Sequence, residues 1–342
     1  MTTPGDPDGD TRQRARLAVL TAVIDGDAGA ALDVVSGLMA EGMSFESLLF
    51  EVIAPLQTDV GLRWQRGDVG IAEEHAVTGA IETLVALLAG SLSNPTEGRH
   101  VVVACAEGDT HSLPARMVAA YLLYLGWRVT FLGSSVPAAD LGSYLSELRP
   151  HALVLSCAIV TCLPGARASI EAAHQAAVPV LAGGRGFGAS PERAHRLGAD
   201  GWVQDPHDID EMLRSWEPDP AAAETGALDP TEDMLTLERG RLDILAEAVG
   251  AAMRSDGEDL ARQGQVRTDL SLLFDAMLAA LLVGDPGVMS DFGTWHRSLV
   301  SPTHGAGATA SIVAALETAV APHSPAAASY LAEARRAVAT PA

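Results

Sequence analysis

Between residues 100 and 216 the sequence alternates short apolar runs with segments of helical periodicity. The apolar runs are HVVVACA, WRVTFLG, HALVLSCAI, VPVLAGG and DGWVQD, and helical segments such as SLPARMVAAYLLYLG and PGARASIEAAHQA separate them. Strands joined by helices pair in parallel, and the helices then cover both faces of the sheet. The pattern predicts a Rossmann-like α/β domain over residues 99–216, with its ligand site at the carboxyl ends of the strands.

Helical periodicity without strand patterns flanks this domain on both sides. Residues 11–95 predict a four-helix bundle with Ser44 and Asp68 as N-caps, and its helices are expected over 11–24, 28–40, 44–65 and 70–91. Residues 233–342 predict an all-α domain, with helices expected over 233–255, 257–283, 286–299, 307–320 and 325–339. The polar segments 1–10 and 217–232 are expected to be a disordered tail and a linker.

The 342-residue chain has a formal net charge of −22, and none of its 22 basic residues is Lys. A negative field repels nucleic acid and anionic membranes, so we expect no direct contact with either. The lack of Lys excludes a Schiff-base lysine and a lysine-containing P-loop. We expect a cytoplasmic protein, because no run approaches the roughly 20 apolar residues of a membrane span and no secretion signal is present.

The three cysteines, Cys105, Cys157 and Cys162, have a spacing that fits no zinc motif. Two of them lie in apolar, strand-like runs, so we interpret all three as reduced core residues. No paired base and nucleophile is evident in the sequence, and we therefore expect that the chain is not itself an enzyme.

Polar residues collect where the predicted strands end. Asp109 and His111 follow the first strand, Ser156 ends the third, and Gly183–Gly184 end the fourth. The carboxyl ends of parallel strands share one edge, so we expect these groups to converge there. An imidazole held by a carboxylate has a fixed tautomer and raised basicity, as a metal-ligating His needs. On this pair alone, the alternative is a capping Asp beside a solvated His.

The order EGDTH, LGWRVTFLGSSVP, LVLS and AGG resembles the cobalamin-binding domain of methionine synthase and its relatives, over residues 100–216. The resemblance implies that His111 is the lower axial ligand of cobalt and that Asp109 is its partner. It also implies a cofactor-contacting loop and a slot for the nucleotide tail, formed by Thr110, Ser112, Leu113, Ser156, Gly183 and Gly184. The chain departs from the family at Pro114, for Gly, and Ala158, for Leu, which puts the slot in doubt but keeps the His–Asp–Ser relay.

A second motif lies in the predicted bundle, where nine residues separate Trp64 from Glu74–His75. On their own these are a core Trp and an ordinary helix His. The spacing resembles adenosylcobalamin-dependent light-sensing transcription repressors. This resemblance implies that Trp64 packs on the adenosyl group, that Glu74 hydrogen-bonds it, and that His75 becomes the upper cobalt ligand after light breaks the Co–C bond. The repressors' DNA-binding module is expected to be missing, since about ten polar residues precede the bundle, so an unidentified partner protein would receive the signal.

The C-terminal region carries a third cluster, in DFGTWHRSLVSPTHG. The domain order resembles the photocobilins, which combine B12 with biliverdin, and it implies a globin-like domain. Without Cys in this region the bilin would be held by contacts, and the residue types nominate Asp291, Trp295, His296, Arg297 and His304. The alternatives are a dimerisation domain with solvated histidines, or haem with His296 or His304 as its axial ligand.

Together these features predict a photoreceptor that binds adenosylcobalamin and biliverdin, with homo-oligomerisation left open. A corrinoid methyl carrier of a methyltransferase system is the second interpretation, since it shares the bundle and the His-bearing domain. A light-independent cobalamin sensor is the third, and it predicts the same binding without photochemistry. The Trp64, Glu74 and His75 spacing favours the photoreceptor, because a methyl carrier has no need to clamp an adenosyl group.

Overall fold

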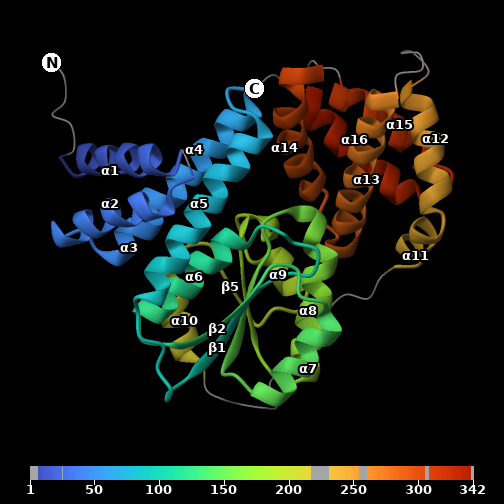
Figure 1. Ribbon diagram of the computed structural model, residues 1–342. Helices are drawn as coiled ribbons and strands as arrows, with labels where there is room; N and C mark the ends of the chain where they lie inside the picture. Colours follow the sequence, from blue (N-terminus) through green and yellow to red (C-terminus); the bar gives the residue numbers. More distant parts are fainter. Residues whose placement is uncertain (1–6, 25, 217–230, 254–259, 305–307, 340–342) are drawn as a thin grey trace, which may run out of the picture. The chain divides into compact units, whose positions relative to one another are not determined.

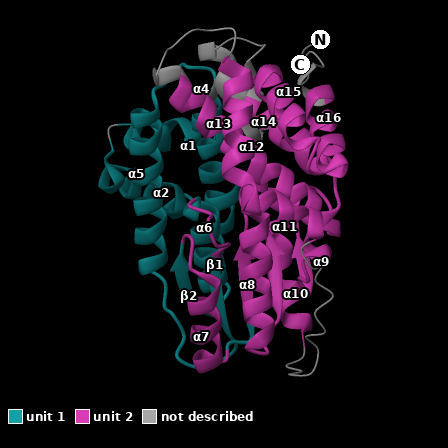
Figure 2. Cartoon of the chain, turned by 90° about the vertical axis from the view of Figure 1, so that its right-hand side faces the viewer, with its two compact units in different colours: residues 1–104, 111–133, 150–152 teal, residues 105–110, 134–149, 153–342 magenta. Residues whose placement is uncertain are grey.

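The computed structural model describes residues 7–24, 26–216, 231–253, 260–304 and 308–339, and Figure 1 shows its helices and strands. The chain divides into two compact units, distinguished by colour in Figure 2. Unit 1 comprises residues 1–104, 111–133 and 150–152, and unit 2 comprises residues 105–110, 134–149 and 153–342. No helix within the described ranges is long and apolar enough to span a membrane.

The N-terminal bundle of unit 1 forms as the periodicity predicts. Its elements are α1 Pro7–Val23, α2 Ala28–Ala40, α3 Phe45–Ser47, the π-helical η1 Leu48–Ile53, α4 Ala54–Gln65 and α5 Ile71–Gly90. Residues 7–10, expected in a disordered tail, begin α1 instead, and residues 1–6 lie outside the described residues. Ser44 is confirmed as an N-cap, because its hydroxyl accepts from the Ser47 amide at 3.0 Å.

The cap predicted at Asp68 is wrong, because Gly70 is the N-cap of α5. The Gly70 amide donates to the Glu73 carboxylate at 2.7 Å, which satisfies the helix start without an Asp. The predicted helix 44–65 also contains the π segment η1. Pro55 has no amide hydrogen for the Glu51 carbonyl, and Arg16 Nε donates to that carbonyl at 2.9 Å. The sequence pattern therefore located the helix but not its change of winding.

The predicted parallel sheet is confirmed, with the strand order β2-β1-β3-β4-β5. The strands are β1 His100–Cys105, β2 Arg128–Gly133, β3 Ala152–Ser156, β4 Val180–Gly183 and β5 Gly201–Val203. The helices are α6 Ser112–Tyr124, α7 Ala138–Leu148, α8 Leu163–Gln175, α9 Glu192–Arg196 and α10 Ile209–Ser215, with short 3₁₀ segments η2 Val160–Cys162, η3 Arg185–Phe187 and η4 Pro206–Asp208. Strand order 2-1-3-4-5 is a doubly wound arrangement, in which ligands bind at the carboxyl edge.

Helix α6 shares the hydrophobic core of the bundle in unit 1. Leu113, Met117 and Tyr121 are buried in the same cluster as the inner faces of α1 to α5. Tyr121 also meets Phe50 edge to face, with 5.1 Å between ring centroids. Burial of this apolar surface fixes α6, and the residues that begin it, against the bundle.

The C-terminal helices of unit 2 are α11 Glu232–Arg239, α12 Arg241–Met253, α13 Leu260–Val283, α14 Gly287–His304, α15 Ala308–Val320 and α16 Pro325–Ala339. The single helix expected over 233–255 is divided at Gly240, and α14 continues beyond the expected end at 299 to His304. Of the expected linker, residues 217–230 lie outside the described residues. An all-α region is confirmed, whereas its globin-like arrangement stays a prediction.

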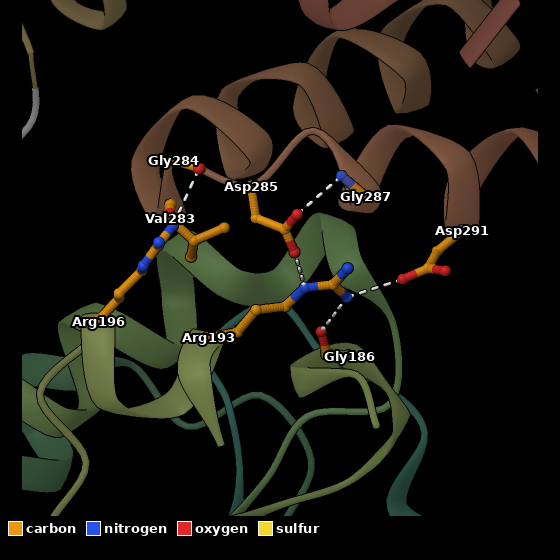
Figure 3. Close-up of polar contacts among 8 residues, drawn as sticks. All are labelled: Gly186, Arg193, Arg196, Val283, Gly284, Asp285, Gly287 and Asp291. Atoms are coloured by element: carbon orange, nitrogen blue, oxygen red, sulfur yellow. Dashed lines mark hydrogen bonds and ion pairs between the residues drawn. The ribbon is translucent and has the colours of Figure 1, made fainter. Parts of the chain in front are cut away.

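A buried arginine joins these helices to the sheet domain within unit 2. Figure 3 shows Arg193 of α9 reaching the turn between α13 and α14. Its Nε donates to Asp285 at 2.7 Å and its Nη1 to Asp291 at 2.8 Å, while 7% of the residue is exposed. Beside it, Arg196 Nη1 donates to the Gly284 carbonyl at 2.9 Å, at the end of α13. A buried guanidinium needs such partners, so α9 fixes this turn.

We expect Arg193→Met to destabilise unit 2 by about 1–3 kcal/mol, because two carboxylates lose their partner in a partly dry site. Guanidinium denaturation followed by circular dichroism measures the change. Arg239→Met is the matched control, since that Arg pairs with Glu232 on the surface with 70% of its side chain exposed; it should cost less than about 0.5 kcal/mol. Equal losses in the two variants would contradict a structural role for the buried pair.

Candidate functional site

The loop after β1 is held firmly by unit 2. Asp109 is fully buried, and its Oδ2 accepts from the Ala158 amide at 2.6 Å. The Gly108 amide donates to the Ser135 hydroxyl at 3.0 Å, and Glu107 Oε2 accepts from the Ala138 amide at 3.2 Å. The predicted loop therefore lies at the carboxyl edge. The relay through Ser156, which is half-buried at the end of β3, stays a prediction, as does the pairing of Asp109 with His111.

Gly165 in the first turns of α8 allows this loop to pack closely. A Cβ at this position would lie 1.9 Å from the Glu107 carbonyl oxygen, so no other residue fits without displacing backbone. The same helix supplies Ser169, whose hydroxyl lies 3.4 Å from the Glu107 amide. Gly165 could not be identified from the sequence, because a glycine inside a helical pattern gives no signal of the backbone that approaches it.

Gly183 and Gly184, at the end of β4, were predicted to let a ligand approach the backbone, and that role stays a prediction. Gly184 has a further reason to be glycine. At Gly184, which has φ +105°, a Cβ would lie 2.5 Å from the Cys157 carbonyl oxygen, and at Gly186 it would lie 2.8 Å from Cys157 Sγ. The protein's own β3 loop therefore occupies the space beside Gly184. Gly183 has ordinary contacts at 3.5 Å and more, so lining a cofactor slot remains a prediction for it.

In unit 1, His111 directly precedes α6 and is exposed. The Ser112 hydroxyl that follows it donates to Glu82 Oε1 of α5 at 2.5 Å. Leu113 packs into the bundle core with 5% exposure, and its contact with a cofactor stays a prediction. Thr110 is exposed at the end of the loop of unit 2.

The motif residues of the bundle form a hydrogen-bonded chain. The carboxylate of Glu74 lies 2.6 Å through Oε2 from His75 Nδ1, and its Oε1 accepts from the Thr78 hydroxyl at 2.7 Å. Gln57 Nε2 of α4 donates to the same hydroxyl at 2.7 Å. Glu74 is 15% exposed and His75 71% exposed, so His75 presents Nε2 to the surroundings.

Trp64 lies half-buried in the last turn of α4. The short turn to α5 makes the two helices an antiparallel pair. On α4, Trp64 lies seven residues nearer to the turn than Gln57. On α5, Ile71 lies seven residues nearer to the turn than Thr78. Seven residues are two turns, so each step stays on one helix face. The Gln57–Thr78 bond thus sets Trp64 opposite the first turns of α5, where Glu74 and His75 lie.

The same arithmetic relates His75 to the start of α6. Glu82, which binds Ser112, follows His75 by seven residues on α5 and lies on the same helix face, about 10 Å along the axis. A single helix therefore carries the motif pair and anchors the residue next to His111.

The residues nominated for pigment binding all belong to α14. Asp291 pairs with Arg193, and Trp295 packs beside Phe292. His296 is 1% exposed, stacked on Phe292, with Nδ1 3.1 Å from the Thr309 hydroxyl. The side chains of Arg297 and His304 lie outside the described residues. Asp291 thus forms an ion pair within unit 2, and pigment binding by all five residues stays a prediction.

The three cysteines are buried and form no disulfide within the described residues, as predicted. Burial raises the pKa of the Cys157 thiol well above its usual value, and the nearby Asp109 carboxylate adds to the shift. The same two causes, in the same order, raise the pKa of Cys162 to about 11. Neither thiol has the thiolate character that nucleophilic or metal-binding cysteines need.

Both predicted cofactor regions match known family models. Residues 99–209 match a B12 binding domain, and residues 16–89 match a second model that is also described as a B12 binding domain. The first match covers the Rossmann-like domain, and the second covers the bundle with Trp64, Glu74 and His75. The chain therefore carries B12-binding domains, as the sequence analysis expected.

Several characterised proteins resemble the chain over these regions. The HTH-type transcriptional repressor CarH of Myxococcus xanthus is 37% identical over 152 residues, which make up 44% of this chain and 48% of that repressor. Dimethylamine corrinoid protein 3 of Methanosarcina mazei is 27% identical over 43% of this chain and 90% of its own length. The structure of the Methanosarcina barkeri monomethylamine corrinoid protein shares the fold, with a TM-score of 0.51 at 16% identity over 60% of this chain and 100% of its own.

The chain thus spans about half the length of the repressor that it matches. That relative is named an HTH-type transcriptional repressor, so the expectation that this chain does not bind nucleic acid stays a prediction. The similarity to a corrinoid protein likewise keeps the second interpretation open.

We expect Gly165→Ala to destabilise the native state by about 1–3 kcal/mol, because the new methyl group overlaps the Glu107 carbonyl and displaces the loop before His111. Gly250→Ala in α12 is the control, since nothing lies within 4 Å of its Cβ position; it should be stabilising by about 0.5–1 kcal/mol. Urea denaturation compares them, and a neutral Gly165→Ala would show that the loop has room to move.

The raised thiol pKa values predict slow alkylation. At pH 8.5, Cys162 should react with iodoacetamide about a hundredfold more slowly in the native chain than in the unfolded one, because a pKa near 11 leaves about a hundredth of the thiolate. Cys157, whose pKa is also raised by burial, should likewise react more slowly in the native chain. The rate should rise as the pH approaches 11. Mass spectrometry of quenched samples measures both, and rapid native labelling at pH 8.5 would contradict this burial.

Proposed function

We propose that the chain is an adenosylcobalamin-dependent photoreceptor in which light rearranges the helical bundle. The Glu74–His75 pair carries the proposal, since a carboxylate at 2.6 Å orients an exposed imidazole on the helix that also anchors the start of α6. The two B12-binding matches and the similarity to CarH support it. When bound, the cofactor would supply a Co–C bond that light breaks.

The chain's own residues then divide the work. His111, exposed before α6, would bind cobalt from below through an imidazole nitrogen. Trp64 and Glu74 would contact the adenosyl group from above, where their helices meet. Glu74 has two tasks in this scheme, because its Oε2 also lies against His75 Nδ1. His75, which is exposed and has its Nδ1 against Glu74, would be available on the bundle to bind cobalt through Nε2 after illumination.

The residues present fit such a cofactor. His111 and His75 are both exposed imidazoles, and the helix that carries His75 also binds the Ser112 hydroxyl next to His111. A shift of α5 would therefore pull on the residue next to the lower ligand, which gives the bundle a route to respond. A partner protein would bind the rearranged bundle and so receive the signal.

We further propose a biliverdin held without a covalent bond among α11–α16.

A corrinoid methyl carrier is the second candidate. The similarity to dimethylamine corrinoid protein 3, over 90% of that protein, favours it specifically. In a methyl carrier, His111 would again be the lower cobalt ligand, whereas Glu74 and His75 would have no role. The two functions therefore differ in what the bundle residues do once the cofactor is bound.

The test is an absorption spectrum of the full chain with adenosylcobalamin, and separately with biliverdin, before and after green and red light. We expect a bound cobalamin spectrum that changes on illumination to a His-ligated form unlike free hydroxocobalamin. Binding with photolysis no different from that of the free cofactor would refute the photoreceptor and favour the methyl carrier or a light-independent sensor. A biliverdin spectrum unchanged by protein would remove the bilin part alone.

Three variants test the two proposed cobalt ligands separately. His111→Ala should weaken cobalamin binding by at least about tenfold and remove the lower-ligand signature in the dark spectrum. His75→Ala should leave dark binding unchanged within about twofold and alter the spectrum after light. His195→Ala, an exposed His of α9, is the control for loss of an imidazole. An unchanged lit spectrum in His75→Ala would exclude His75 as the replacement ligand.

A further inference from the structure

We propose that Gln57 and Thr78 are positioning residues that fix the tautomer of His75, so that its Nε2 carries the lone pair. Neither residue belongs to the motif that nominated Trp64, Glu74 and His75. The proposal rests on the proposed function in that His75 is taken to bind cobalt. Its evidence is the continuous chain of hydrogen bonds from Gln57 on α4 through Thr78 and Glu74 to His75 on α5.

The direction of every bond in this chain follows from the carboxylate. An ionised Glu74 can only accept, so the 2.7 Å contact with Thr78 requires the hydroxyl to donate its single proton to Oε1. The Thr78 oxygen can then only accept from its other neighbour. The 2.7 Å contact with Gln57 must therefore come from the amide nitrogen, with Nε2 as donor.

The same logic reaches the imidazole at the other end. With Oε1 bound to Thr78, Oε2 faces His75 Nδ1 at 2.6 Å and accepts the proton there. A neutral imidazole has one proton, so Nε2 is left as the acceptor and metal-binding atom. Adjacent helix residues do not face each other, and Thr78, one turn along, is what turns the Glu74 carboxylate toward His75.

The orientation of Gln57 shows that this order is imposed on the amide. With Nε2 committed to Thr78, Gln57 Oε1 is buried and has no hydrogen-bond partner among the described residues. A rotated amide would not remove the unpaired group, because it would place the Nε2 donors at the same buried position. It would also make Gln57 Oε1 compete with Glu74 Oε1 for the single Thr78 proton, so the described orientation is the one that keeps the Thr78–Glu74 bond. Gln57 therefore acts through Thr78 and Glu74, and it touches neither His75 nor the cofactor.

Two substitutions reverse or cut the chain while keeping the shape. Gln57→Glu replaces the donor by an acceptor, so the Thr78 proton is contested between two carboxylates. Thr78→Val removes the hydroxyl at nearly constant volume. Thr78→Ser restores it and is the rescue variant. The matched controls are Thr83→Val on α5 and Thr58→Val on α4, whose hydroxyls bond only carbonyls of their own helices among the described contacts, Gly79 at 2.8 Å and Ala54 at 3.1 Å.

The first readout needs no cofactor. Nitrogen-15 NMR of the full chain labelled at histidine reports the tautomer of each imidazole, with His75→Ala assigning the signal of interest. We expect Nδ1–H for His75 in the wild type, Thr78→Ser and both controls. In Thr78→Val and Gln57→Glu the signal should move toward the averaged mixture of a free imidazole. A His75 signal identical in all variants, or a wild-type Nε2–H form, would overturn the proposal.

The second readout joins the proposal to the photoreceptor. In chain reconstituted with adenosylcobalamin, the rate at which the His-ligated form appears after a flash should fall about tenfold in Thr78→Val and Gln57→Glu, with dark binding unchanged. An unchanged rate would overturn the link to ligation. Absence of any light-driven ligation in the wild type would refute the proposed function instead, and the NMR result would then stand or fall by itself.

Discussion

A buried carboxylate is unfavourable unless hydrogen-bond donors surround it, and Asp109 meets this requirement in part through the Ala158 amide at 2.6 Å. This bond ties the loop after β1 to the loop after β3. Gly165 then lets α8 close on the Glu107 carbonyl, so a helix as well as a strand end supports the loop. The carboxyl edge of the sheet is therefore rigid where the cofactor loop begins. A flexible edge could not hold an axial ligand in one position.

The rigid edge continues toward the C-terminal helices through bonds within unit 2. The Cys157 carbonyl, one residue before Ala158, accepts from the Gly186 amide at 2.9 Å. The Gly186 carbonyl lies 3.5 Å from Arg193 Nη1, and the same nitrogen contacts Asp291. At Gly184 and Gly186, atoms of Cys157 leave no room for a Cβ. Any change in the packing of this stretch would therefore require the backbone to move. The sheet edge and α14 are thus connected by hydrogen bonds and ion pairs rather than by apolar packing alone.

Regular periodicity explains why the elements could be predicted from the sequence. Buried strands such as HVVVAC are continuous Val-rich runs, and the bundle helices repeat apolar residues at helical spacing. The errors fall where a single residue changes hydrogen bonding: Pro55 gives the π segment and Gly240 divides a helix. Gly70 replaces Asp68 as a cap because Glu73 supplies the acceptor. Such changes leave the apolar period intact, so the pattern cannot report them.

The sequence predicted several residues of the candidate site, but not the residues that form hydrogen bonds with them or beside them. The sequence located Asp109, Glu74 and His75, since strand ends and a spaced motif mark them. It could not locate Gln57, Thr78 or Glu82, because their roles depend on the register between α4, α5 and α6, which side-chain packing sets. The glycines after β4 illustrate the same limit, since a close approach was expected and its partner, Cys157, was not.

A carboxylate–imidazole pair at Asp109 and His111 stays a prediction, and the structure describes a further pair at Glu74 and His75. The two carboxylates differ in what surrounds them. Asp109 is fully buried and bound by backbone, which suits a fixed support. Glu74 keeps 15% of its side chain exposed and is bound by side chains, which can exchange partners when a ligand arrives or leaves. The proposed photoreceptor needs both kinds of carboxylate, because one cobalt ligand must persist while another changes.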